Sequence, residues 1–139
     1  MPRLRPETRA RARALQALYA WDLRDGDALD RIANQVWDDL AIAPDERAFA
    51  SQIIRTIITD GKSIDDALRD VTTNWRLERL GAVERAVLRI AAAELRRGDP
   101  PARVAIQEAV RLAERYGSEQ SARFVNGVLD ALARRMGRL

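Results

Sequence analysis

The stretch RLGAVERAVLRIAAAELRR (residues 79–97) determines the fold expected for the whole chain. On a helix its apolar side chains cover most of the circumference instead of forming one narrow stripe. The inward positions are Leu80, Val83, Val87, Ile90, Ala91 and Leu95. Such a helix belongs in the centre of a bundle. Glu94 falls within the apolar face, where an unpaired charge is costly, so we expect a structural carboxylate bonded to a neighbouring backbone group or arginine.

The rest of the chain also has helical spacing, and no alternation of period two predicts a strand. The fold class expected is all-α, with about seven helices arranged as two small three-helix bundles packed on one another. The helices are expected over residues 6–24, 28–40, 44–61, 63–75, 80–97, 102–116 and 118–136. Asp60-Gly61 is interpreted as a helix stop and Ser63 as the next N-cap. We expect residues 1–139 to form a single domain, with bundles over about 1–75 and 76–139.

The composition excludes several classes of function. The 139 residues contain no Cys and no His, which removes thiol nucleophiles, imidazole acid–base chemistry and the common zinc sites. Asp38-Asp39 and Asp65-Asp66 are adjacent pairs that diverge by about 100° on a helix, so they do not form a shared acid or metal site. We therefore expect no enzyme activity, no metal and no cofactor. No apolar run of about 18 residues occurs, which predicts a cytoplasmic protein without a membrane span.

The strongest functional pattern lies in the first expected helix. Arg5, Arg9 and Arg13 recur every four residues with Gln16 on the same face, and no carboxylate stands three or four positions away. Arg11 has Glu7 at that distance. The opposite face is apolar and suits a bundle core, which favours nucleic acid over a membrane as the polyanion that supplies the missing counter-charge.

A second candidate site lies in the last expected helix. Arg123 and Asn126 stand opposite its apolar face, with Phe124 at the edge. Asn126 and Gly127 cost about 1 kcal/mol of helix propensity, so another requirement keeps them there. One interpretation is close helix packing over Gly127 with Phe124 in the core. The other is a partly exposed Phe124 that stacks on a base beside a phosphate contact from Arg123.

Four segments together resemble the NusB family of bacterial transcription antitermination factors. They are RARARALQALYAWDL, RLGAVERAVLRIAAAEL, PARVAIQEAVRLAERYG and SARFVNGVLDALA, and they occur in the family's order and spacing. The resemblance implies two three-helix bundles and binding of boxA-type single-stranded RNA in ribosomal RNA transcripts. It also implies partnership with NusE, a small-subunit ribosomal protein, within an RNA polymerase antitermination complex.

The resemblance also implies individual site residues. Those implied for RNA are Arg9, Arg11, Arg13, Gln16, Arg89, Arg123, Phe124 and Asn126, to which the helical spacing adds Arg5. Those implied for the partner surface are Tyr19 and Glu84. Thr8 departs from the family pattern, because another basic residue is frequent there.

The residues alone leave three alternatives open. Residues 25–75 carry five basic and eleven acidic groups, so a helical adaptor for a basic protein, without RNA specificity of its own, is the competing hypothesis. Tyr19 and Glu84 could also be an ordinary core edge and a solvated carboxylate. An apolar helical face could be covered by a partner or by a second copy in a homodimer.

Overall fold

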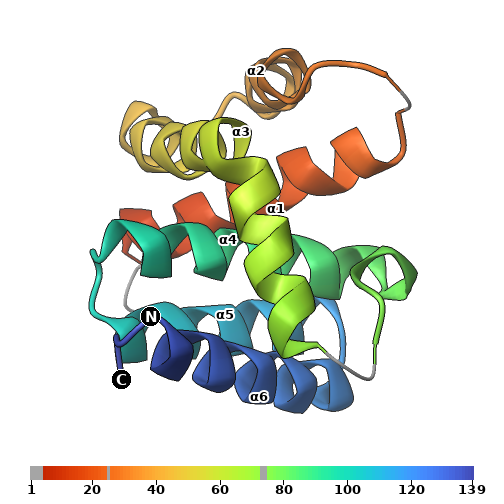
Figure 1. Ribbon diagram of the computed structural model, residues 1–139. Coiled ribbons are helices and arrows are strands. Elements are labelled where there is room, and N and C mark those ends of the chain that lie inside the picture. The colour runs from red at the N-terminus through yellow and green to blue at the C-terminus, as the bar shows by residue number, and fades with distance from the viewer. Residues whose placement is uncertain (1–4, 25, 73–74) are drawn as a thin grey trace.

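The computed structural model describes residues 5–24, 26–72 and 75–139, and Figure 1 shows helices joined by short loops. The elements in chain order are α1 (Pro6–Asp22), α2 (Leu29–Leu40), α3 (Pro44–Val71), the 3-10 turn η1 (Leu77–Arg79), α4 (Ala82–Arg97), α5 (Ala102–Tyr116) and α6 (Glu119–Arg135). No strand occurs in these described ranges. The all-helical prediction is confirmed.

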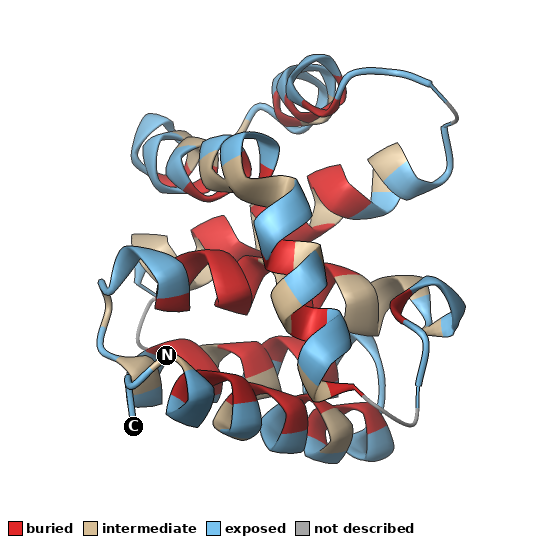
Figure 2. Cartoon of the chain, in the orientation of Figure 1, coloured by how far each residue is buried: buried red, intermediate tan, exposed pale blue. Residues whose placement is uncertain are grey.

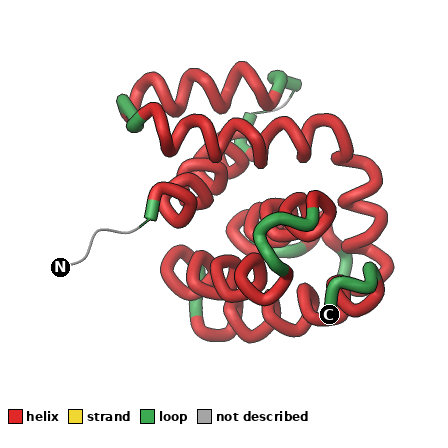
Figure 3. Tube along the Cα trace, turned by 90° about the vertical axis from the view of Figure 1, so that its left-hand side faces the viewer, coloured by secondary structure: helices red, strands yellow, loops and turns green. Residues whose placement is uncertain are grey.

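The expected boundary between two helices at Asp60-Gly61 corresponds to a kink in α3. Asp60 leaves helical geometry there, at φ −111° and ψ 16°, so the helical segments before and after it meet at a bend. Figure 3 shows the resulting change of direction of the tube. Ile57 before the bend and Ile64 and Leu68 after it are all buried, so both segments contribute to the same core. The end of the helix expected over 63–75 includes residues 73 and 74, which lie outside the described residues.

Helix α4 occupies the centre of the molecule, as its apolar circumference predicts. It packs against α1, α3, α5 and α6, and Val87, Leu88 and Ala91 on it are fully buried. Figure 2 shows the buried residues on the facing sides of the helices. The surrounding helices therefore share one hydrophobic core.

Two groups of three helices are visible around that core. Helices α1, α2 and α3 pack on one another, and so do α4, α5 and α6. The long α3 also extends across α4 and reaches α6, as Figure 1 shows in yellow-green. The two bundles are thus joined by the contacts of α3 with α4 and α6. None of the helices described is long and apolar enough to cross a membrane.

Candidate nucleic-acid interface

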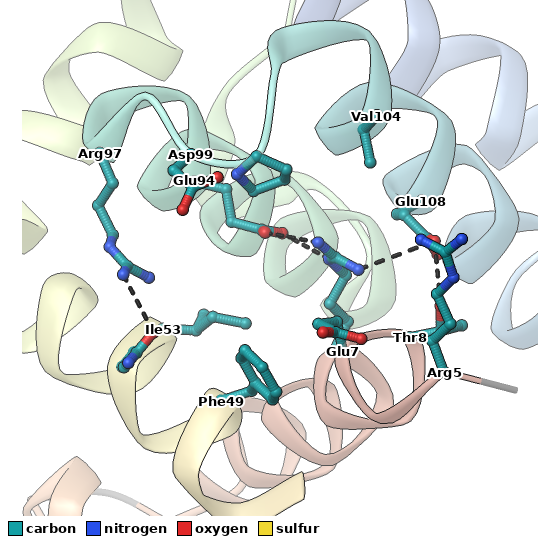
Figure 4. Close-up of a pocket in the computed structure, with 13 residues that line it drawn as sticks. Arg5, Glu7, Thr8, Phe49, Ile53, Glu94, Arg97, Asp99, Val104 and Glu108 are labelled. Carbon is teal, nitrogen blue, oxygen red and sulfur yellow. Dashed lines mark hydrogen bonds and ion pairs between the residues drawn. The ribbon is translucent and has the colours of Figure 1, made fainter. Parts of the chain in front are cut away.

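Arg11 lies inside the protein, paired with a carboxylate of α4. Its side chain donates from Nε to Oε1 of Glu94 at 2.7 Å and from Nη2 to Oε2 at 2.8 Å. The carboxylate of Glu108 on α5 lies 3.8 Å from Nη1. Figure 4 shows Glu94 and Glu108 approaching this guanidinium from two sides. Burial lowers the pKa of Arg11, but the hydrogen bonds and charge of Glu94 outweigh burial and raise it.

The assignment of Arg11 to RNA binding is therefore corrected. Only 6% of the residue is exposed, and its nitrogens are directed to internal carboxylates. Arg11 stands four residues before Leu15 and seven before Leu18, so it belongs to the inward face of α1. For the same reason its ion-pair partner is Glu94, not Glu7. The expectation that Glu94 is a structural carboxylate bonded to an arginine is confirmed.

Arg9 and Arg13 form the outward cluster of α1. Arg9 donates from Nε to Oε1 of Glu46, and Arg13 donates from Nε to Oε2 at 3.1 Å. Arg13 also donates from Nη1 to Gln16 at 3.2 Å. The expectation that these arginines have no counter-charge is wrong, because the first turn of α3 supplies one. Both guanidiniums contact this carboxylate, and about a quarter of each arginine side chain is exposed at the surface.

Glu46 orients this pair of arginines, a role that its position in the sequence did not indicate. It is buried, with only 5% of the residue exposed. Burial alone raises the pKa of a carboxyl group, but the hydrogen bonds from Arg9 and Arg13 outweigh burial and lower the pKa of Glu46. It therefore stays charged at neutral pH. Acidic residues are common in the first turn of any helix, so its position in PDER (residues 44–47) did not mark it as a partner of α1.

Arg89 and Arg5 have different surroundings. Arg89 is half-buried on α4 and donates hydrogen bonds to both carboxylate oxygens of Asp65, at 3.0 and 3.1 Å. Its guanidinium carbon lies 5.8 Å from the centre of the Trp21 ring. It links α4 to α3 and α1, so we leave it out of the proposed RNA contacts. Arg5 is exposed immediately before α1 and lines the pocket drawn in Figure 4.

The block on α6 presents both polar and aromatic groups. Arg123 and Asn126 are exposed, while Phe124 is half-buried. The Phe124 ring meets the exposed Trp75 edge to face, with 6.0 Å between the ring centres. A side chain at Gly127 would meet nothing within 4 Å, so close helix packing does not explain this glycine and that interpretation is wrong. Phe124 instead stands at the boundary between the core and the surface.

Tyr19 and Glu84 lie at the same end of two neighbouring helices. Asp22, near the end of α1, pairs with Arg85 in the first turn of α4 at 2.5 Å, which holds these helix ends together. Tyr19 is 44% exposed, so its ring is available at the surface. Glu84 is half-buried and accepts a hydrogen bond from Oγ of Ser121 at 2.5 Å. Glu84 is therefore not a merely solvated carboxylate.

Helix α5 adds two arginines that the sequence analysis did not single out. Arg111 and Arg115 are exposed and line a groove whose other wall is the α1 segment with Arg9 and Arg13. Their spacing of four residues on an expected helix was a usable signal. The placement of α5 beside α1 was needed to give that spacing a meaning.

The chain was compared with known proteins. The NusB family model matches residues 8–134. The transcription antitermination protein NusB of Anaeromyxobacter sp. (strain Fw109-5) is 46% identical over 129 residues, which cover 91% of this chain and 88% of that protein.

Solved structures are similar over nearly the same length. A chain in the crystal structure of a plectonemic RNA supercoil has a TM-score of 0.87 at 30% identity, covering 96% of this chain and 97% of that one. A chain in a crystal structure of the antitermination factors NusB and NusE with double-stranded RNA has a TM-score of 0.84 at 31% identity. That match covers 96% of this chain and 99% of the other.

Proposed function

The chain belongs to the NusB family, and from that premise we propose that it is a non-enzymatic RNA-binding factor acting in transcription antitermination together with NusE. The observation that carries the proposal is the outward cluster of α1, in which Arg9 and Arg13 lie together, partly exposed, and are both oriented by Glu46. A partly exposed surface that brings guanidiniums together suits the phosphates of a nucleic acid. Nascent transcripts are made in the bacterial cytoplasm, where we place its action.

We assign the RNA contacts to two segments. The proposed residues are Arg5, Arg9, Arg13 and Gln16 at α1, and Arg123, Phe124 and Asn126 on α6. Phe124, half-exposed beside Trp75, suits contact with an unstacked base, while the arginines suit phosphates. The RNA is proposed to be of the boxA type. Because the RNA in the similar NusB–NusE crystal structure is double-stranded, both a single strand and a duplex belong in the test.

We assign NusE contact to the end of the molecule where Tyr19 and Glu84 lie. An exposed aromatic ring and a carboxylate at the same end of two neighbouring helices suit a basic protein partner, because the ring supplies contact area and the carboxylate an ion pair. Glu84→Lys is expected to slow association with NusE without changing the helical circular dichroism. An unchanged association rate would remove Glu84 from this surface.

The RNA assignment is tested with two matched variants of the full chain. Arg9→Ala/Arg13→Ala/Glu46→Gln removes both guanidiniums without leaving a buried carboxylate unpaired, whereas Glu46→Gln alone retains both. RNA affinity is measured by fluorescence anisotropy at several salt concentrations, with boxA-type and scrambled RNA. We expect the triple variant to lose about 1.4 from the slope of log K against log salt, since each phosphate contact on a single strand contributes roughly 0.7.

The outcomes separate the two classes of function. Retained RNA affinity in Glu46→Gln and a reduced salt slope in the triple variant support RNA binding through α1. If the wild-type chain binds neither RNA with NusE present, or if the triple variant loses NusE and keeps its RNA affinity, the helical adaptor becomes the better description.

A further inference from the structure

The groove between α1 and α5 has a strongly basic lining. Its walls are formed by Thr8, Arg9, Ala12, Arg13, Glu108, Arg111, Leu112, Arg115 and Tyr116. Its volume is about 300 Å³, and Ala12 and Leu112 give it an apolar floor. Four of the nine lining residues are arginines, two from each helix.

The carboxylates near this groove are already engaged with α1. Glu108 accepts a hydrogen bond from Oγ1 of Thr8 at 3.0 Å and lies near the buried Arg11. Glu46 is shared by Arg9 and Arg13. None of these carboxylates pairs with the two arginines of α5.

Arg111 makes no hydrogen bond or ion pair within the described residues. Arg115 contacts only the ring of Tyr116, with 5.4 Å between its guanidinium carbon and the ring centre. Like charges four residues apart on a helix are destabilising by a few tenths of a kcal/mol, so the pair is not explained by the stability of α5. Both side chains are exposed and lie about 6 Å apart along the helix axis.

Helix α5 lies between two hollows in the protein surface. On one side, α5 forms the groove with Arg9 and Arg13 of α1. On the other side, Val110 and Glu114 of α5 line a second hollow with Arg123 and Asn126 of α6. The exposed ridge with Arg111 and Arg115 therefore lies between the two segments assigned to RNA.

We propose that Arg111 and Arg115 bind phosphates of the same RNA strand and carry it across α5, from the arginines of α1 to the block on α6. The α1–α5 groove then forms one continuous part of the RNA-binding surface. Tyr116 supports the guanidinium of Arg115 at the edge of this groove. This inference rests on the proposed RNA-binding function. It extends that function to two residues on a third helix.

The test compares two double variants of the full chain. Arg111→Ala/Arg115→Ala removes the ridge. Arg31→Ala/Arg55→Ala removes the same charge from exposed arginines of α2 and α3, whose side chains have no partner within the described residues. RNA affinity is measured by fluorescence anisotropy from about 50 to 300 mM salt with a boxA-type oligonucleotide, with and without NusE. Circular dichroism checks that both variants remain helical.

We expect the α5 variant to bind RNA roughly tenfold or more weakly at the lowest salt, with the salt slope reduced by about 1.4 for two lost phosphate contacts on a single strand. The α2–α3 control is expected to keep the wild-type slope. An equal loss in both variants overturns the proposal, since it shows a general effect of net charge.

The remaining outcomes distinguish this inference from the function on which it rests. If the wild-type chain binds RNA and Arg111→Ala/Arg115→Ala keeps its affinity and slope, the ridge is not an RNA contact and the proposed function stands. If the variant loses NusE while its RNA slope is unchanged, the ridge is a protein-binding surface and the inference is wrong. If the wild-type chain binds no RNA even with NusE, both proposals fail.

Discussion

Arg11 and Arg13 stand two residues apart on α1, yet their surroundings are opposite. Arg11 is buried and faces two carboxylates, Glu94 and Glu108, from two other helices. Arg13 shares one carboxylate, Glu46, with Arg9 at the surface. The arginine of the inner cluster is thus enclosed by the protein, whereas about a quarter of each arginine side chain of the outer cluster is exposed.

This difference shows how one arginine-rich helix can serve two purposes. Inside the protein, excess carboxylate oxygens satisfy the guanidinium and fix α1 against α4 and α5. At the surface, Glu46 orients two guanidiniums that remain partly exposed. The outer cluster is therefore preorganised for an anion, whereas the guanidinium of the inner cluster is buried and already paired. Substitutions that separate stability from RNA affinity test the comparison.

The largest expected effect is on stability, from Arg11→Met. It leaves Glu94 buried without its partner, which costs about 3 to 5 kcal/mol in the free energy of unfolding. Urea unfolding followed by circular dichroism measures the change. The matched double variant Arg11→Met/Glu94→Leu is expected to recover much of the loss, because it removes both charges. A cost below about 1 kcal/mol for the single variant would show that the inner cluster is not structural.

Arg89→Ala is expected to have the next largest effect on stability. It removes one partner of the Arg89–Asp65 ion pair. The Arg89 side chain is 15% exposed, between that of Arg11 and those of the outer arginines, and the Asp65 side chain is 22% exposed. Losing two charged hydrogen bonds at such exposure costs about 1 to 2 kcal/mol. RNA affinity of the folded variant is expected to stay within about twofold of wild type. A large loss of affinity with unchanged stability would return Arg89 to the RNA-binding residues.

Much of the fold followed from the sequence because helical periodicity is local. The circumference of α4 predicted its central position, and the inward Glu94 predicted a bond to a neighbouring backbone group or arginine, which is Arg11. The helix boundary predicted at Asp60-Gly61 corresponds to the kink at Asp60. The direct continuation of α3 beyond the kink was not predicted, because it depends on the packing of the buried Ile64 and Leu68 and not on helix propensity alone.

The candidate site was only partly predictable, because the charge of a surface depends on partners distant in sequence. Arg9 and Glu46 are separated by 37 residues, and Arg11 and Glu94 by 83. A rule based on positions three or four residues away could find neither pair. The inward place of Arg11 could have been inferred from Leu15 and Leu18, whereas the role of Arg111 required knowing that α5 lies beside α1.

A smaller effect is expected in the pH dependence of stability. The pKa of Glu46 is lower in the folded chain than its ordinary value. Its contribution to the free energy of unfolding is therefore complete above the pKa of the unfolded chain, about 4.3, and is lost as the pH falls through the pKa of the folded chain. Glu46→Gln is expected to lower the free energy of unfolding at pH 7 by about 1 kcal/mol. The free energy of unfolding of this variant is also expected to fall less steeply with acidification than that of wild type. An equal dependence on pH in the two proteins would mean that Glu46 does not hold the outer cluster.

The smallest expected effect concerns Tyr116, whose ring supports Arg115 but carries no charge itself. A cation–π contact at an exposed site contributes about 0.5 to 1 kcal/mol, so Tyr116→Ala is expected to weaken RNA binding by roughly two- to fivefold. The salt slope stays unchanged, because Arg115 retains its charge. Tyr116→Phe keeps the ring and is expected to bind as wild type does. Anisotropy titrations of both variants at one low salt concentration measure these affinities. Equal losses in the two variants would mean that the hydroxyl group of Tyr116 contributes to RNA binding, and not the support of the guanidinium by the ring.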